Sequence, residues 1–183
     1  MKIPRIALAA YGFALLIIVI DQLTKAWIIS GLDLRDVGRV SVWPPIFNFT
    51  WVENRGVSFG LFGDGSARWM LSVFSVVVAG ILGWWALKAD RRLLVSAIGL
   101  IMGGAIGNVI DRIRFGFVVD FLDFSGPHFF LPGFIPFLGG MKVSFPWVFN
   151  VADGAITMGV ILLILDSVLS ERAAKVGVAA EKS

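Results

Sequence analysis

Hydrophobic residues dominate four long stretches of the chain, and polar residues gather where these stretches end. The stretches cover roughly residues 6–29, 69–87, 93–110 and 147–169. A helix needs about 20 mostly apolar residues to cross a bilayer core of about 30 Å. We therefore predict a membrane all-α bundle of four transmembrane helices. It forms a single integral membrane domain over residues 1–172, with a flexible cytoplasmic tail over residues 173–183.

The charges that flank these stretches predict how the bundle is oriented in the membrane. Lysine and arginine are abundant before the first span, between the second and third, and after the fourth. Basic residues in short flanks favour the cytoplasmic side of a membrane. Both termini are therefore expected in the cytoplasm, and the segments 30–68 and 111–146 are expected on the outer side.

The composition narrows the chemistry that the chain can perform. With 57% hydrophobic residues and a mean hydropathy of +0.86, it belongs among integral membrane proteins. It has no cysteine, which excludes disulfides and thiolate sites, and its single histidine argues against a catalytic zinc ion. We expect no metal and no cofactor. The net charge of +3 resides at helix ends, so it does not indicate nucleic-acid binding.

The first outer segment has the residue pattern of a β-strand. Aromatic and polar residues alternate from Ile46 to Trp51, which would give a strand one apolar face. Pro44 and Pro45 exclude a helix at this point. We predict a small amphipathic sheet on the membrane surface.

The second outer segment contains an apolar stretch that is broken by proline and glycine. Residues 126–145 are rich in phenylalanine, but Pro132 and Pro136 prevent a regular helix. The stretch is too short and too interrupted to span a bilayer, so we predict an interfacial loop or lid. One hypothesis is that it helps to hold a substrate, and the other is that it only packs on the bundle.

Polar residues that are unusual at membrane depth occur at the outer ends of the spans. Such groups usually pair or take part in chemistry, because placing them in lipid is costly. The clusters contain Asp21 and Lys25, then Glu53, Asn54 and Arg55, then Asn108, Asp111 and Arg112, then Asp120, and finally Asn150 and Asp153. Their shared location predicts a polar active site just inside the outer face of the membrane.

Several of these clusters also have a simpler explanation. Asp21 and Lys25 lie four residues apart on one helix face, so they form either a snorkelling interface pair or a pair that orients its polar neighbours. Asn150 and Asp153 match a helix N-cap as well as a functional cluster. Asp120 lies among apolar and aromatic residues without a local basic partner, which favours a functional role.

The polar cluster at the end of the third span has two readings as well. Asn108 shares a helix face with Asp111 and Arg112, and a helix end that meets water would explain all three. Small residues precede them at positions 103–107, however, and these allow close approach of another helix. We therefore expect the cluster to face the interior of the bundle.

Two aspartates in a partly desolvated site have a well-defined chemical use. They can share one proton, so that one acts as a base toward water and the other as an acid toward a scissile amide. The sequence shows no serine or cysteine nucleophile with a plausible base near it.

Five short motifs follow one another along the four predicted spans. They are Asp21-Gln-Leu-Thr-Lys25, Asn54-Arg-Gly-Val-Ser-Phe59, Gly107-Asn-Val-Ile-Asp-Arg112, Val118-Val-Asp-Phe121 and Phe149-Asn-Val-Ala-Asp153. In this order and on this topology, they resemble the bacterial signal peptidase II family, the lipoprotein signal peptidases. The resemblance extends from Asp21 to about Asp166.

The resemblance implies a membrane aspartyl endopeptidase. Such an enzyme removes the signal peptide from diacylglyceryl-modified prolipoproteins by cutting on the N-terminal side of the lipidated lipobox cysteine. By matching position, Asp120 and Asp153 would be the catalytic pair. The supporting or substrate-binding residues would be Asn54, Gly56, Asn108, Asp111, Arg112, Asn150, Asp21 and Lys25.

The family also implies the surroundings of the enzyme. Its fold adds a small extracytoplasmic β-cradle to the four helices, and globomycin-type inhibition is a family trait. The implied partners are a lipidated prolipoprotein and membrane lipids, with no nucleic acid and no metal, and the protein would be a monomer. It would reside in the bacterial cytoplasmic (inner) membrane, with its active site near the periplasmic face.

One departure from the family pattern leaves the choice of catalytic pair open. The chain between Asp120 and Asp153 is longer than is usual, with residues 126–145 as the insertion. Asp123 therefore competes with Asp120. We retain Asp120 because it has the family's spacing from Asp111.

Two other classes of function compete with a peptidase. A small transporter or channel subunit could use Asp21, Asp111 and Asp153 as a proton relay. The chain lacks the internal repeat that is common in transporters, and its polar residues gather at the outer edge, which favours proteolysis. A purely structural membrane protein would not need Asp120.

Overall fold

The computed structural model describes residues 5–56, 66–125, 128–130, 142–144 and 148–181. The helices are α1 (Arg5–Ala26), continued by the π-helical turn η1 (Trp27–Gly31), then α2 (Leu34–Val37), α3 (Ser66–Ala86), α4 (Arg92–Phe115) and α5 (Val151–Glu181). The strands are β1 (Arg39–Trp43), β2 (Phe47–Asn54), β3 (Val118–Asp123), β4 (His128–Phe130), β5 (Lys142–Ser144) and β6 (Val148–Phe149).

In the described part of the chain, four helices are long and apolar enough to cross a membrane, as the hydropathy pattern predicted. They are Ile6–Gly31, Ala67–Ala86, Arg92–Phe115 and Val151–Ala173. The largest differences from the predicted boundaries concern the last two helices. The last one, α5, continues to Glu181, so the helix includes most of the segment 173–183 that was predicted to be a flexible tail. The third helix continues to Phe115, so that Asp111 and Arg112 belong to the helix, and the fourth helix begins at Val151 rather than at residue 147.

The third of these helices, α4, is the centre of the bundle. In its most apolar stretch, 67% of α4 is buried inside the protein, against 22% for each of the other three helices. Their outer faces carry exposed apolar side chains, among them Leu15, Val73, Phe74 and Ile164. Such faces suit contact with lipid, whereas α4 packs against α1, α3 and α5.

Small residues allow this central packing. A Cβ atom at Gly103 of α4 would lie 2.7 Å from the carbonyl oxygen of Ala14 on α1, and one at Gly99 would lie 2.6 Å from that of Ala10. Gly104 faces Ala152 of α5 equally closely. The predicted close approach of helices to this stretch is therefore confirmed.

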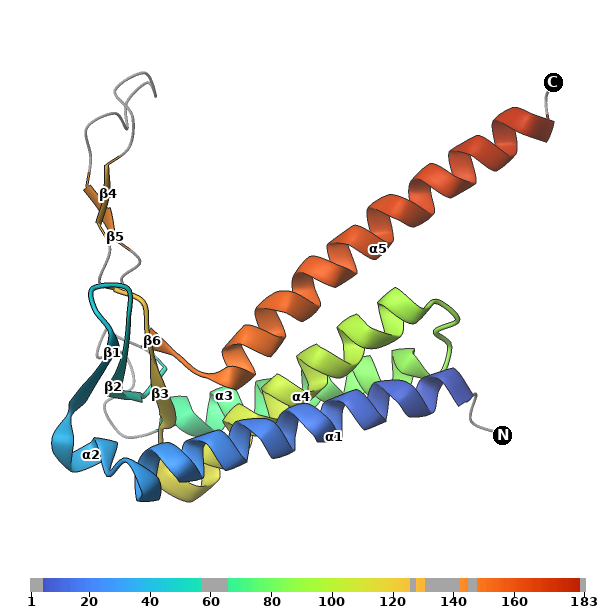
Figure 1. Ribbon diagram of the computed structural model, residues 1–183. Helices are drawn as coiled ribbons and strands as arrows, with labels where there is room; N and C mark the ends of the chain where they lie inside the picture. The colour runs from blue at the N-terminus through green and yellow to red at the C-terminus, as the bar shows by residue number, and fades with distance from the viewer. Residues whose placement is uncertain (1–4, 57–65, 126–127, 131–141, 145–147, 182–183) are drawn as a thin grey trace.

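A small antiparallel sheet covers one end of the bundle, in the strand order β1-β2-β3-β6. The predicted strand at residues 46–51 is confirmed, since β2 runs from Phe47 to Asn54. The chain enters the sheet from α4 through Gly116, whose φ of +84° ends the helix in the left-handed region that favours glycine. In Figure 1 the sheet lies at the end of the bundle opposite to the start of α1 and the end of α5.

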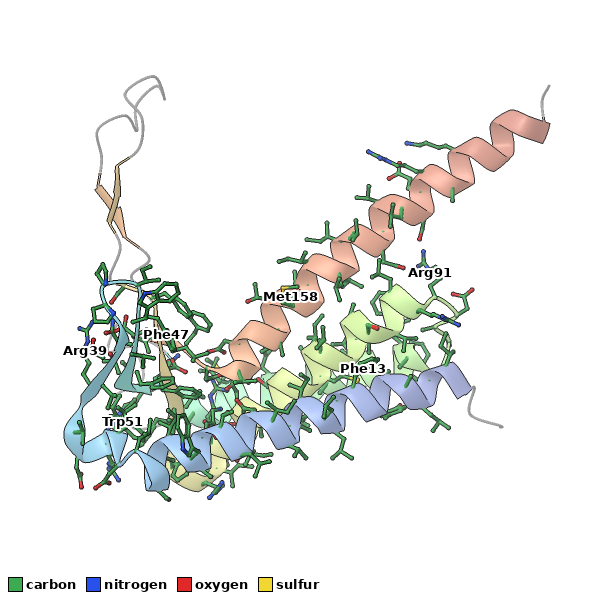
Figure 2. All side chains as sticks on the ribbon, in the orientation of Figure 1. Phe13, Arg39, Phe47, Trp51, Arg91 and Met158 are labelled. Carbon is green, nitrogen blue, oxygen red and sulfur yellow. The ribbon has the colours of Figure 1, made fainter. Side chains whose placement is uncertain are left out.

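An apolar cluster joins the sheet to the end of α1. Ile28, Leu34, Val119 and Phe121 are almost fully buried there. Phe49 contacts Trp27 and Phe121 through its ring, and Phe117 contacts Trp51. Figure 2 shows the side chains of Phe47 and Trp51 gathered at the sheet. This packing holds β3, and with it Asp120, against the helices.

The second outer segment contributes a two-stranded ribbon. Strands β4 and β5 pair antiparallel, with His128 opposite Ser144 and Phe130 opposite Lys142. The rest of the stretch 126–145 lies outside the described residues. Its assignment as an interfacial loop or lid therefore stays a prediction.

Candidate active site

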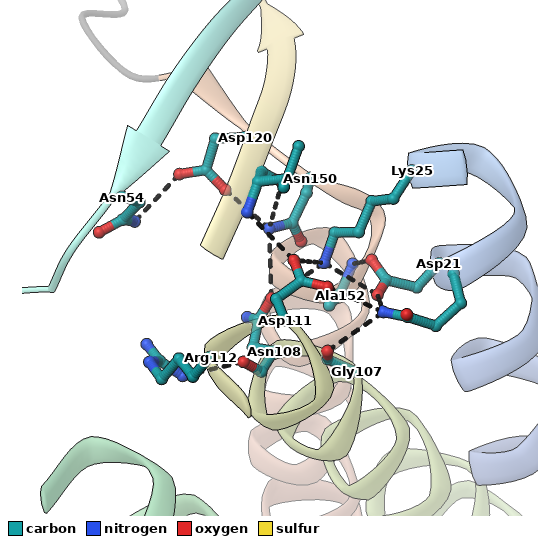
Figure 3. Close-up of polar contacts among 12 residues, drawn as sticks. Asp21, Lys25, Asn54, Gly107, Asn108, Asp111, Arg112, Asp120, Asn150 and Ala152 are labelled. Atoms are coloured by element: carbon teal, nitrogen blue, oxygen red, sulfur yellow. Dashed lines mark hydrogen bonds and ion pairs between the residues drawn. The ribbon is translucent and has the colours of Figure 1, made fainter. Parts of the chain in front are cut away.

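All ten site residues expected from the sequence belong to one connected set of hydrogen bonds and ion pairs at the sheet end of the bundle. Figure 3 shows the contacts around Lys25, Asp111 and Asn150. Helix α1 contributes Asp21 and Lys25, and α4 contributes Asn108, Asp111 and Arg112. The sheet contributes Asn54, Gly56 directly after β2, and Asp120. Asn150 and Asp153 are at the start of α5. Segments from across the whole chain therefore meet at one site.

Asp120 is a buried carboxyl that is held by two amides. Its side chain on β3 is 2% exposed. Asn54 Nδ2 donates to one carboxyl oxygen at 3.0 Å, and Asn150 Nδ2 donates to the other at 2.7 Å. Both partners are neutral, so the amides orient the carboxyl without adding a positive charge.

Asp153, in the first turn of α5, is held by Asn108 and by Asn150, the asparagine that also binds Asp120. Asn108 Nδ2 donates to Asp153 Oδ1 at 2.9 Å, and the backbone N–H of Asn150 donates to Oδ2 at 3.3 Å. In return, Asn150 Oδ1 accepts the Asp153 N–H at 3.0 Å. Asn150 is thus a helix N-cap in a reciprocal capping arrangement and also a bridge between the two aspartates.

The orientation of each amide follows from its other contacts. Asn54 Oδ1 accepts the backbone N–H of Gly56 at 3.0 Å, so its Nδ2 faces Asp120. Gly56 has a φ of +94°, and an added Cβ would collide with the side chain of Leu71, so this turn requires glycine. Similarly, Asn108 Oδ1 accepts from Lys25 and Asn150, which leaves its Nδ2 for Asp153.

The surroundings of Asp120 favour its protonated form. Burial raises the pKa of Asp120, and the nearby charge of Asp153 raises it further, to about 7. The hydrogen bonds from Asn54 and Asn150 lower this pKa but do not outweigh the burial. The two carboxyls therefore interact electrostatically, as a pair that shares a proton must.

Asp123, the alternative to Asp120, faces a different environment. Because the two residues are three apart in one strand, their side chains lie on opposite faces of the sheet. Asp123 accepts hydrogen bonds from Thr50 and Ser125 and pairs with Arg39. Burial raises the pKa of Asp123, yet these partners together bring it below its ordinary value. The partners of this carboxyl all belong to the sheet or follow it directly, so it stabilises the sheet.

Asp21 and Lys25 do not snorkel to the membrane surface. Lys25 is 2% exposed, and Asp21 and Asp111 are fully buried. The Lys25 Nζ lies 2.9 Å from Asp21 Oδ2 and 2.7 Å from Asp111 Oδ2. The pair therefore belongs to a buried cluster that orients polar neighbours, which was the other reading of the sequence.

Gln22 is a further member of this site for which the sequence suggested no role. Its Nε2 lies 3.0 Å from Asp111 Oδ1, 3.1 Å from Asp21 Oδ2 and 3.3 Å from the carbonyl oxygen of Gly107. The available signal was its position inside the motif that begins at Asp21.

A cavity of about 300 Å³ reaches the site from between α3, α4 and α5. Its polar lining includes Asn108, Arg112 and Asp153. Its other lining residues are Phe74, Ser75, Val78, Ile101, Ala105 and Ile156. One carboxyl of the pair is thus reachable from a mostly apolar pocket within the membrane-spanning part of the fold.

Chemically, this arrangement can supply an acid and a base side by side. A carboxyl with a pKa near 7 can donate a proton, and its ionised partner can accept one. Such a pair is suited to hydrolysis of an amide by an activated water.

Comparison with known proteins identifies a family that matches most of this chain. Residues 13–169 match the family model described as signal peptidase (SPase) II. A lipoprotein signal peptidase of Caulobacter vibrioides is 43% identical over 173 residues, which cover 93% of each chain. One of Shewanella loihica is 40% identical, covering 88% of this chain and 87% of the relative.

Solved structures agree with the fold. A bacterial membrane enzyme determined by the in meso method at 2.3 Å superposes with a TM-score of 0.66 at 27% identity, covering 91% of this chain and 90% of the other. A second, determined at 1.9 Å, also gives a TM-score of 0.66, at 28% identity. These matches confirm a bundle with a small sheet.

Proposed function

The chain is a member of the signal peptidase II family, and on that premise we propose that it is an aspartic endopeptidase with Asp120 and Asp153 as its catalytic pair. Its substrates are prolipoproteins that carry a diacylglyceryl group on the lipobox cysteine. It cuts on the N-terminal side of that cysteine and releases the signal peptide. The protein is a multi-pass bacterial membrane protein, and its active site lies near the periplasmic face.

In the proposed reaction, the ionised Asp153 takes a proton from a water molecule as the oxygen attacks the scissile carbonyl carbon. The protonated Asp120 donates its proton to the carbonyl oxygen. As the tetrahedral intermediate collapses, the C–N bond breaks and the amine takes the proton held by Asp153, while one hydroxyl of the intermediate returns its proton to Asp120 as the new carbonyl forms. No covalent enzyme intermediate is needed.

One observation carries this proposal: Asn150 donates to both carboxyls, through Nδ2 to Asp120 and through its backbone N–H to Asp153. The pKa of Asp120, near 7, supports the assignment of the shared proton to that residue. Arg112 lines the same cavity as Asp153.

The location of the pair also suits the proposed substrate. A signal peptide and a diacylglyceryl group both reside in the bilayer, and the cavity at Asp153 has mainly apolar walls within the helical bundle. A mostly apolar cavity with a few polar groups is the usual form of a site that binds and orients a ligand.

The test is cleavage of a diacylglyceryl-modified prolipoprotein by purified variants. Asp120→Asn and Asp153→Asn should each abolish cleavage and leave folded protein in the membrane, because one amide cannot supply the missing acid or base. Asp123→Asn, on the same strand but the other face, is the matched control and should keep most of the activity. Substantial turnover by either of the first two variants would refute the catalytic pair, and loss of all activity in Asp123→Asn would make Asp123 the rival.

A further inference from the structure

The residue that directly precedes each proposed catalytic aspartate donates its backbone N–H to a buried carboxylate of α1 or α4. Asp21 Oδ1 accepts the backbone N–H of Ala152 at 3.0 Å, and Ala152 precedes Asp153. Asp111 Oδ2 accepts the backbone N–H of Val119 at 3.0 Å, and Val119 precedes Asp120. The first bond also satisfies an amide in the first turn of α5, which has no partner within its own helix.

A single lysine connects these two carboxylates. Lys25 Nζ lies within ion-pair distance of Asp21 and of Asp111. Its third contact, at 3.4 Å, is Asn108 Oδ1, and the other end of that amide donates to Asp153. An ammonium group has three N–H donors, and all three are used here.

From this geometry we infer that Asp21, Lys25 and Asp111 form a positioning triad that sets the separation and the relative orientation of Asp120 and Asp153. The inference rests on the proposed function. Asp21 fixes the backbone beside one catalytic carboxyl, Asp111 fixes the backbone beside the other, and Lys25 holds the two anchors together. None of the three has to contact the substrate.

Gly107 supports this role. A Cβ atom at position 107 would lie 2.7 Å from Asp21 Oδ2, so only glycine leaves room for the Asp21 carboxylate beside α4. Gln22 adds a neutral bridge between the same two carboxylates. In this cluster, one oxygen of Asp21 and one oxygen of Asp111 thus each accept a backbone N–H.

Stability alone does not account for such a cluster. Replacing a buried ion pair by apolar residues is often neutral or even stabilising, because burying charges costs free energy. The bundle offers a direct comparison in Asp166 of α5, which is also nearly buried and pairs with Arg91 at 2.9 Å at the opposite end of the bundle. Figure 2 shows Arg91 there, far along the helices from the sheet.

The experiment measures kcat, KM and backbone amide exchange in Lys25→Met and in Asp166→Asn. In Lys25→Met we expect kcat to fall on the order of 10²-fold with little change in KM, since a misplacement of about 1 Å has that effect. The amide protons of Val119 and Ala152 should exchange faster. Asp166→Asn also removes the charge of a nearly buried carboxylate from an ion pair, here with the partly exposed Arg91, but kcat and these two amides should be unchanged.

Asp21→Asn is the second variant, because it leaves Lys25 paired with one carboxylate, that of Asp111. Asp21 uses one oxygen for Lys25 and the other for Ala152, whereas an asparagine has a donor NH2 in place of the second oxygen and cannot accept at both positions. We expect a lower kcat and faster exchange at Ala152 but not at Val119. If Lys25→Met fails to fold, the kcat and the amide exchange of Asp21→Asn test the inference in its place.

A wild-type kcat in folded Lys25→Met or Asp21→Asn overturns the inference, as does unchanged exchange at Val119 and Ala152. The same loss of kcat in Asp166→Asn would reduce the triad to a general stabiliser. Failure of the proposed function has a different signature, namely retained cleavage in Asp120→Asn or Asp153→Asn. The exchange measurement does not depend on cleavage, so it tests the anchors in either case.

Discussion

At the scale of single residues, neutral amide side chains, and not charged ones, donate the side-chain hydrogen bonds that orient the two carboxyls. Asn54, Asn108 and Asn150 orient the two carboxyls through neutral N–H donors. A lysine or arginine at the same distance would hold the pKa of a carboxyl low and make it a poor acid. Neutral donors leave the pKa of Asp120 near 7, where it can donate a proton at physiological pH.

The first prediction at this scale concerns pH. Asp120 acts in its protonated form, which is present below its pKa and is lost as the pH rises through about 7. Cleavage of a lipidated prolipoprotein should therefore decline on the alkaline side of about 7. The kcat/KM profile of wild-type enzyme between acidic and alkaline buffers measures this. Full activity well above that pH would argue against Asp120 as the acid.

The second residue-scale prediction concerns Asn54. Its hydrogen bond lowers the pKa of Asp120, so Asn54→Ala should raise that pKa and move the alkaline limb to higher pH. The turnover should also fall, because the carboxyl loses one of its two orienting partners. Arg55→Ala is the control, since Arg55 is exposed and pairs only with Glu53 among the described residues. An alkaline limb at the wild-type position in Asn54→Ala would contradict the assigned role.

At the scale of the elements, α4 determines how the site is assembled. It packs against α1 on one side and α5 on the other, and both of these helices carry site residues. Its glycines bring the backbones close enough for short side chains such as Asp21, Asn108 and Asp153 to meet. Close approach of backbones through small residues is a common way for helices to associate in lipid.

Substitution of these glycines tests that view. Gly103→Ala should reduce thermal stability, because its Cβ would lie 2.7 Å from the Ala14 carbonyl oxygen, and overpacking costs about 1–3 kcal/mol. Gly80→Ala on α3 is the matched control, with nothing within 4 Å of the new atom. Thermal unfolding of both variants in the same detergent measures the difference. Equal stability would show that α1 and α4 can separate slightly without loss.

At the scale of the whole molecule, the two ends of the bundle differ in structure. One end carries the sheet and the polar site, while the start of α1 and the end of α5 lie at the other (Figure 1). The distribution of lysine and arginine predicts that this second end is cytoplasmic. The site would then face the periplasm, where a peptidase meets prolipoproteins that have been exported and lipidated.

Topology reporters test this orientation. A reporter fused after Ser183 should behave as cytoplasmic, and one inserted near residue 63 should behave as external. An alkaline phosphatase and a fluorescent protein give opposite signals at the two positions. The reverse pattern would contradict the orientation predicted from the basic flanks.

The amino-acid sequence by itself determined the elements whose cause is local. Four spans follow from runs of apolar residues, because each helix satisfies its own backbone in lipid and needs only length and hydropathy. Strand β2 follows from the alternation between Ile46 and Trp51. The motifs further identified the residues that would form a site, through resemblance to a family rather than through any visible contact.

Only the tertiary structure decided how those residues act together. The sequence left Lys25 either snorkelling or orienting its neighbours, and its two buried carboxylate partners excluded the first reading. The contacts of Gln22 and the two backbone anchors could not be read from the sequence, although Gln22 lies inside a recognised motif. The reason is physical: Asp21 and Ala152 are 131 positions apart, and a hydrogen bond depends on ångström-scale placement by the packed helices. Hydropathy and periodicity are local properties and carry no such information.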